Sequence, residues 1–124
     1  MTADDIAAIQ KAVALYGHII DDKRWDDLDL VFTEDAAYDV TCVGAGVYTG
    51  LPAIRAFLSG FEHPLGHFAT NIVVDARADG GADVESKGIT LRRDKSIGMA
   101  SYKDVAVRTD AGWRIAVRVC GIRA

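Results

Sequence analysis

The spacing of apolar residues changes once along this chain, and the change limits how the chain can fold. From Asp4 to about Asp22, apolar residues recur every three or four positions, which is typical of a helix with one buried face. Beyond Gly66, runs rich in Val, Ile and Thr alternate with turn residues, which indicates strands. The sequence therefore predicts a helical N-terminal part followed by a sheet.

Two shorter helices are expected between these parts. Residues 25–32 repeat the helical spacing, and this helix should end near residues 33–35. A short strand over residues 37–43 should follow. The third helix should have Pro52 in its first turn, a position that suits proline, and should close at Gly60.

Four long strands are expected in the rest of the chain. Residues 79–81 separate the first, residues 67–78, from the second, residues 82–91, and turns at residues 93–95 and 110–112 delimit two more. Strands joined by successive hairpins form an antiparallel meander. The prediction is an α+β fold with three N-terminal helices packed on the concave face of a curved antiparallel sheet.

Length and charge fit one domain and argue against a nucleic-acid partner. The 124 residues are enough for a single core, so we expect one domain over residues 1–124. The 14 Lys and Arg against 18 Asp and Glu give a formal net charge of −4, and no basic run is present. Binding to a phosphate backbone would lack its usual electrostatic footprint.

The cysteines and the N-terminus bear on the compartment. Cys42 and Cys120 are the only cysteines, and each lies in an apolar stretch, so two free thiols that pack as small hydrophobes are expected. The acidic start, residues 1–5, lacks the features of a signal peptide, and no stretch approaches membrane-spanning length. The sequence predicts a cytoplasmic protein without a membrane partner.

Several short motifs occur in an order that resembles a known superfamily. They are Tyr16-x-x-x-x-Asp21, Trp25-Asp26-x-Leu28-x-x-x-Phe32-x-x-Asp35-Ala36, Gly50-x-x-Ala53-Ile54, His67-x-x-x-Asn71, Tyr102-x-Asp104 and Gly112-Trp113-Arg114-Ile115-x-x-Arg118. Together they cover nearly the whole chain, which resembles the nuclear transport factor 2-like superfamily and, within it, the SnoaL-like group of small cyclases, dehydratases and isomerases. The resemblance implies that the sheet is strongly curved and forms, with the helices, a cone-shaped α+β barrel that encloses a cone-shaped pocket. It implies no single reaction, because steroid isomerases, scytalone and bile-acid dehydratases, epoxide hydrolases, polyketide cyclases and proteins without catalysis share that fold.

The resemblance also implies three catalytic residues. In the dehydratase-like relatives a Tyr on the first helix, an Asp five residues later and a His that opens the long strand line the pocket, and here these are Tyr16, Asp21 and His67. A phenol, a carboxylate and an imidazole on otherwise apolar elements suit acid/base chemistry in a closed pocket. Beside an ionised Asp21, the imidazole would keep one nitrogen free to accept a proton.

Each of the three also has a structural interpretation. Tyr16 lies on the buried helix face, where its hydroxyl could instead bond a backbone carbonyl. Asp21 is about 140° round an ideal helix from Tyr16, so the two share a face only if the helix ends there; otherwise Asp21 is a solvated helix-end charge. His67 could be a core histidine with a purely structural hydrogen bond.

Six further residues are candidates for binding substrate. Asn71 shares strand parity with His67, so both should face the pocket, where the amide could bind a substrate carbonyl or satisfy the backbone. Arg118 matches the closing motif and could face either way, and a solvated strand arginine is the favoured interpretation. The remaining candidates are Tyr102 and Asp104, which share parity, and Trp25 and Phe57 on the apolar helix faces.

The sequence implies no metal and no cofactor. His63 and His67 are four residues apart, but a proline and a glycine between them break the helical register that a zinc-binding pair needs. The glycines of residues 44–50 miss the dinucleotide fingerprint and fit a hairpin turn. Neither cysteine has a base nearby in sequence and no nucleophile elbow occurs, so nucleophilic catalysis has no support.

These residues favour a cofactor-independent lyase, a dehydratase acting by general acid/base catalysis on a small hydrophobic, carbonyl-bearing substrate such as a steroid, terpenoid, polyketide or aromatic. His67 would remove the proton α to the carbonyl, and Tyr16 would donate to the oxygen that gains charge or leaves. The alternatives are a ketosteroid isomerase-like double-bond shift, with Asp104 as the candidate strand base, and a non-catalytic domain that binds small ligands.

A homodimer is also expected. The meander should leave an outer sheet face that carries several apolar side chains, and such a face is a common site of self-association. These side chains are Val73, Ile97, Val105 and Val107.

Overall fold

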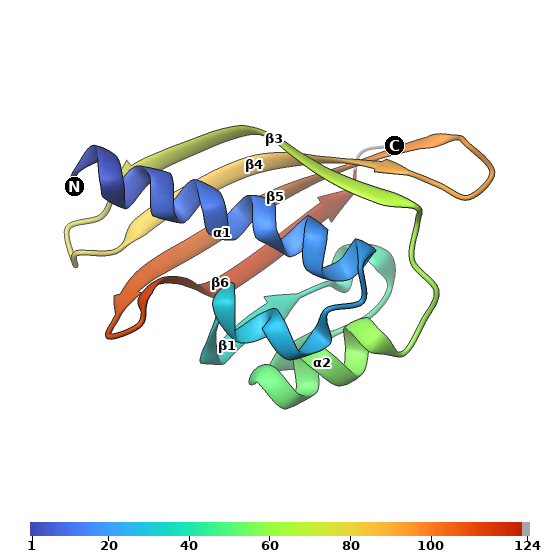
Figure 1. Cartoon of the computed structure of the whole chain (residues 1–124), viewed down its shortest axis with the longest axis horizontal. Helices are drawn as coiled ribbons and strands as arrows, with labels where there is room; N and C mark the ends of the chain where they lie inside the picture. The colour runs from blue at the N-terminus through green and yellow to red at the C-terminus, as the bar shows by residue number, and fades with distance from the viewer. Residues whose placement is uncertain (123–124) are drawn as a thin grey trace.

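The structure is a computed structural model that describes residues 1–122, in which helices cover one face of a curved six-stranded sheet (Figure 1). The first part of the chain forms α1 (Ala3–Asp21), the 3₁₀ helix η1 (Trp25–Leu30), β1 (Phe32–Asp39), the 3₁₀ turn η2 (Thr41–Val43), β2 (Val47–Thr49) and α2 (Leu51–Ser59). Four long strands follow: β3 (Gly66–Ala76), β4 (Ala82–Leu91), β5 (Ile97–Thr109) and β6 (Gly112–Ile122). The predicted α+β class is confirmed.

The sheet contains the expected meander and one pairing that was not expected. Strands β3 to β6 pair antiparallel in chain order, and the full strand order is β2-β1-β6-β5-β4-β3. β1 pairs with β6 in parallel, so the prediction of a wholly antiparallel sheet is wrong at this point. Residue patterns indicate where strands occur. They do not indicate that β1 pairs with β6, because the two strands are far apart in sequence and their pairing depends on the path of the chain between them.

Helix α1 matches its prediction closely. Thr2 and Asp5 form a capping box at its start, in which the Thr2 hydroxyl accepts from the Asp5 N–H and the Asp5 carboxylate accepts from the Thr2 N–H. The helix lies across the sheet face (Figure 1), and its last residue is Asp21. Ile6 of the predicted apolar stripe is half-buried, and the rest of the stripe is buried in the core: Ile9, Val13, Tyr16 and Ile20.

A glycine allows α1 to approach β3. A Cβ atom at Gly17 would lie 2.7 Å from the backbone oxygen of His67, which is closer than real Cβ contacts allow. Only glycine therefore fits at this crossing. The close approach brings the end of α1, with Asp21, beside the start of β3, with His67.

The segment after α1 differs from its prediction. Residues 25–30 form a 3₁₀ helix, and the strand begins at Phe32 rather than at residue 37. The register of β1 against β6 shifts between Phe32 and Ala37, so the buried residues of this strand do not alternate in a regular way. Residues 41–43, predicted as strand, form the turn η2.

The cysteines are joined, so the prediction of two free thiols is wrong. Cys42 and Cys120 form a disulfide with their Cα atoms 6.2 Å apart, although they are 78 residues apart in sequence. The unexpected parallel pairing explains the bond, because it places the chain that leaves β1 beside β6. Disulfides persist mainly in oxidising compartments, so this bond weighs against the predicted cytoplasmic location.

No helix within residues 1–122 is both long and apolar enough to cross a membrane.

Candidate active site

A pocket of about 370 Å³ lies between α2, the following segment and the sheet. Its wall is largely apolar and aromatic, with a few polar groups that point into it, as is usual for small-molecule sites. The polar and aromatic side chains that matter below are Tyr16, Tyr38, Phe57, His63, His67 and Tyr102.

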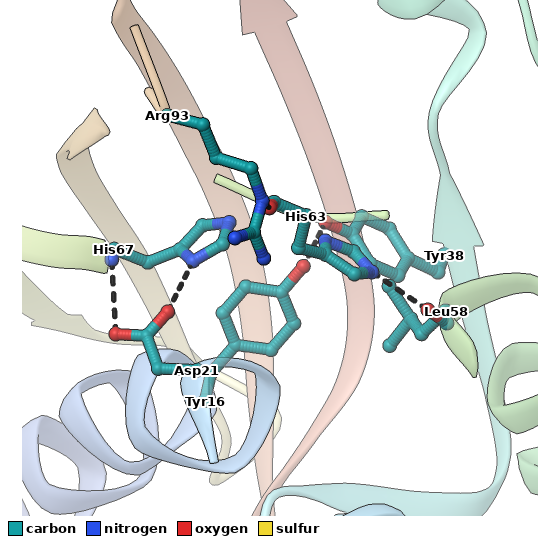
Figure 2. Close-up of polar contacts among 7 residues, drawn as sticks. All are labelled: Tyr16, Asp21, Tyr38, Leu58, His63, His67 and Arg93. Atoms are coloured by element: carbon teal, nitrogen blue, oxygen red, sulfur yellow. Dashed lines mark hydrogen bonds and ion pairs between the residues drawn. The ribbon is translucent and has the colours of Figure 1, made fainter. Parts of the chain in front are cut away.

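His67, which lines this pocket, is hydrogen-bonded to Asp21. Nδ1 of His67 lies 2.6 Å from Oδ1 of Asp21, and the backbone N–H of His67 donates to Oδ2 at 3.1 Å (Figure 2). A carboxylate can only accept, so the proton of the neutral ring is on Nδ1 and Nε2 keeps a free lone pair. Asp21 was expected to share a face with Tyr16 only if the helix ended at Asp21, and α1 does end there.

Two tyrosines form a buried hydroxyl pair next to this imidazole. The hydroxyl oxygens of Tyr16 and Tyr38 are 2.5 Å apart, and both residues line the pocket. Burial, followed by the effect of neighbouring tyrosines, raises the pKa of both phenols above the ordinary value. Both therefore stay protonated at neutral pH, and since one hydroxyl donates to the other, one proton of the pair remains for a ligand.

Arg118 is buried behind these tyrosines, so the interpretation as a solvated strand arginine is wrong. It is 1% exposed, and its guanidinium carbon lies 3.8 Å from the ring centroid of Tyr102 and 4.4 Å from that of Tyr16. Its Nε is 3.7 Å from a carboxylate oxygen of Asp104. Burial raises the pKa of Asp104, and the charge of Arg118 offsets part of that rise.

Some predicted binding residues lie at the pocket and others do not. Phe57 and Tyr102 line it, whereas Trp25 packs behind the wall with its ring 5.9 Å from that of His63. Asp104 is not among the lining residues. Asn71 is exposed at a bulge where β3 loses its regular register, with a φ of 53°, so the parity argument that placed it beside His67 fails.

Tyr38 and His63 are two of the pocket residues that the sequence analysis did not name as site residues. Tyr38 alternates with the buried residues Ala36 and Val40, and this alternation was the signal that would have placed its phenol on the inner face of the sheet. His63 was considered only as a metal ligand. Within residues 1–122, no cluster of three or more His, Cys, Asp or Glu side chains offers a metal site.

Comparison with known proteins agrees with this geometry. A model of the SnoaL-like domain matches residues 1–119. The chain belongs to the SnoaL-like family. This confirms the resemblance inferred from the motifs, although the family spans several reactions and leaves the chemistry of this SnoaL-like chain open to argument from its site.

Three similar proteins illustrate the relationship. The SnoaL-like chain is 32% identical over 123 residues to the uncharacterised protein Rv2910c of Mycobacterium tuberculosis, covering 93% of this chain and 83% of the relative. An NTF2-like protein with a cystatin-like fold from Novosphingobium aromaticivorans is 25% identical, with a TM-score of 0.84 over 96% of this chain and 82% of that one. A "Putative Scytalone Dehydratase" from the same organism is 24% identical, with a TM-score of 0.81 over 97% and 85%, and shares the fold.

Proposed function

We propose that this protein is a cofactor-independent dehydratase that removes water from a small hydrophobic β-hydroxy carbonyl compound. The observation that carries the proposal is the pairing of Asp21 with His67 at a pocket that also holds the Tyr16–Tyr38 hydroxyl pair. A base held by a carboxylate and a hydrogen-bond donor for the carbonyl oxygen are the two parts that proton abstraction next to a carbonyl requires.

In the proposed reaction, Nε2 of His67 takes the proton α to the carbonyl. The C–H electron pair forms the enolate, whose oxygen accepts a hydrogen bond from the tyrosine pair. The enolate then expels the β-hydroxyl group. As it departs, this group takes the proton from the imidazolium and leaves as water, which restores the neutral base. Asp21 remains ionised throughout, holds the ring and stabilises the transient imidazolium.

The isomerase alternative has less support from the geometry. A double-bond shift of the ketosteroid isomerase type was expected to use Asp104 as its base, but that carboxylate is 3% exposed, lies beside Arg118 and does not line the pocket. The binding-only alternative was favoured if Asp21 and His67 were apart. Their hydrogen bonds argue against it.

The proposal is tested with a panel of β-hydroxy ketones and thioesters with one, two or three rings, followed by ultraviolet absorbance of the conjugated product. We expect at least one member to lose water, and Asp21→Asn to slow that reaction by roughly 10²- to 10⁴-fold. The His67 backbone N–H should hold the amide oxygen of the new side chain, which turns the amide N–H toward Nδ1. The ring would then carry its proton on Nε2 and lose its function as a base.

A folded Asp21→Asn protein with unchanged turnover would remove the support for His67 as an oriented base. If no panel member reacts while hydrophobic ketones bind with micromolar affinity or better, the binding-domain alternative is the correct one.

We also propose that two copies pair through the outer sheet face. Val73, Val117 and Val119 are each more than a third exposed there, and Val105 lines the same groove as Val117 and Val119. Ile97, expected on this face, instead lies at the pocket. Sedimentation at micromolar concentration should show twice the monomer mass, and Val119→Lys should shift it to the monomer mass. A wild-type protein that sediments as a monomer would contradict this proposal.

A further inference from the structure

A second histidine, His63, lines the same pocket as His67. It lies in the segment between α2 and β3, and its ring centroid is 5.8 Å from that of His67. Figure 2 shows both imidazoles beside the hydroxyl end of the Tyr16 phenol. The proposed elimination uses one imidazole, so the second is available for another purpose.

Several contacts hold His63 in place. Its Nε2 lies 2.6 Å from the backbone oxygen of Leu58, near the end of α2, and its own backbone oxygen accepts from Nε of Arg93 at 3.2 Å (Figure 2). Arg93 also pairs with Glu62 at 2.6 Å, which ties this segment to the β4–β5 turn. The ring packs on Phe61 with centroids 4.1 Å apart. The orientation of the imidazole is therefore fixed before any ligand arrives.

The contact with Leu58 determines the tautomer of His63. A carbonyl oxygen can only accept, so Nε2 carries the proton. Burial, with a smaller effect from His67, lowers the pKa of His63 and favours the neutral ring, whose Nδ1 then has a lone pair. No residue in the described part of the chain donates to that nitrogen. His67 is the opposite tautomer, with Nδ1 protonated and Nε2 free.

Among the two tyrosines and the two histidines, one donor proton and two acceptor nitrogens thus remain free. The tyrosine pair supplies the donor, which suits a carbonyl oxygen, and Nε2 of His67 is the acceptor for the α proton. Nδ1 of His63 remains, and a ligand that displaced water from it without replacing the hydrogen bond would bind less tightly. The group that complements this acceptor in an apolar ligand is a hydroxyl.

We propose that Nδ1 of His63 accepts a hydrogen bond from a hydroxyl group of the ligand, so that the pocket selects carbonyl compounds that carry a hydroxyl at a distance from the carbonyl. This inference rests on the proposed function in two respects: the ligand binds in the same pocket, and the tyrosine pair binds its carbonyl oxygen. The competing explanation is purely structural, because a histidine that caps the last carbonyls of a helix needs no ligand.

The test uses ligands that cannot be dehydrated. 1-Tetralone and its 5-, 6- and 7-hydroxy isomers are aromatic ketones without a β-hydroxyl, so their binding can be measured by calorimetry whatever the reaction is. We expect at least one hydroxy isomer to bind wild-type protein roughly 3- to 10-fold more tightly than 1-tetralone, the usual effect of one neutral hydrogen bond. In His63→Phe, which keeps an aromatic ring but has no polar atom, the isomer and the parent should bind equally.

Two further variants separate recognition from structure. Thr90→Val removes another hydroxyl from the same pocket at nearly constant shape, and it should leave the preference intact. His63→Leu repeats the loss of the acceptor with a different shape, so that one misfolded variant does not decide the result. Thermal melts identify any variant that fails to fold.

The inference is overturned if no hydroxy isomer is preferred by the wild-type protein. It is also overturned if the preference survives in the folded His63 variants, or if they bind all four ketones more weakly by the same factor, which is the result expected of a structural cap. If the preference depends on His63 while the β-hydroxy panel stays unreacted, the dehydratase proposal fails and the recognition of a hydroxyl stands.

Discussion

Replacing His67 with alanine is expected to lower kcat/KM for dehydration by roughly 10²- to 10⁴-fold, because a positioned general base contributes about that much to proton transfer. The imidazole is the base of the proposed mechanism. The other imidazole at the pocket, that of His63, could replace it only from a ring position 5.8 Å away. The double variant with Asp21→Asn should be scarcely slower than His67→Ala alone, since the two side chains act as one unit.

His18→Ala is the matched control for this variant. His18 is exposed on α1, so its loss changes the histidine content without reaching the pocket, and the rate should be unchanged. Steady-state kinetics on the best panel substrate and a thermal melt of each variant complete the comparison. Normal turnover by a folded His67→Ala protein would show that the imidazole is a core residue, and the dehydratase proposal would fall with it.

The second large effect is expected at the tyrosine pair. Tyr16→Phe should lower kcat by roughly 10²- to 10³-fold, as does the loss of other donors to a developing oxyanion. If Tyr16 is the residue that donates to the substrate, Tyr38 donates to Tyr16 and acts on the substrate only through it, so Tyr38→Phe should cost only about 10-fold. Rapid-quench or stopped-flow kinetics would separate this effect on chemistry from product release.

The relative size of the two losses identifies the donor. A larger loss for Tyr38→Phe would assign the direct hydrogen bond to Tyr38 instead, while two folded variants with wild-type rates would show that the pair has no role in stabilising the enolate. Because the two hydroxyls share one hydrogen bond, the double variant should lose less than the product of the single losses.

The features that could be predicted from the sequence are those that depend on local pattern. The spacing of apolar residues predicted α1, and the turn residues predicted the long strands of the meander, each to within a few residues. The motifs named Asp21 and His67 as candidates but left open whether they meet. The structure shows that they do and gives the reason, which is the close approach of α1 to β3 at Gly17.

The features that were missed depend on irregular or long-range pairing. A bulge in β3 breaks the strand alternation that had placed Asn71 on the same face as His67, and no residue pattern indicated this bulge. The burial of Arg118 results from stacking on Tyr16 and Tyr102, which come from two other elements. The disulfide depends on the parallel pairing of β1 with β6. In each case the partner is far away in sequence, where spacing carries no information.

The disulfide has a practical consequence for every measurement proposed above. Cys120 lines the pocket, and its bond to Cys42 ties β6 to the turn that carries Val43 of the same wall. Protein purified in dithiothreitol and protein oxidised in air are therefore different molecules at the substrate-binding wall. Rates and affinities of variants are comparable only when the thiol content of each preparation has been titrated and matched.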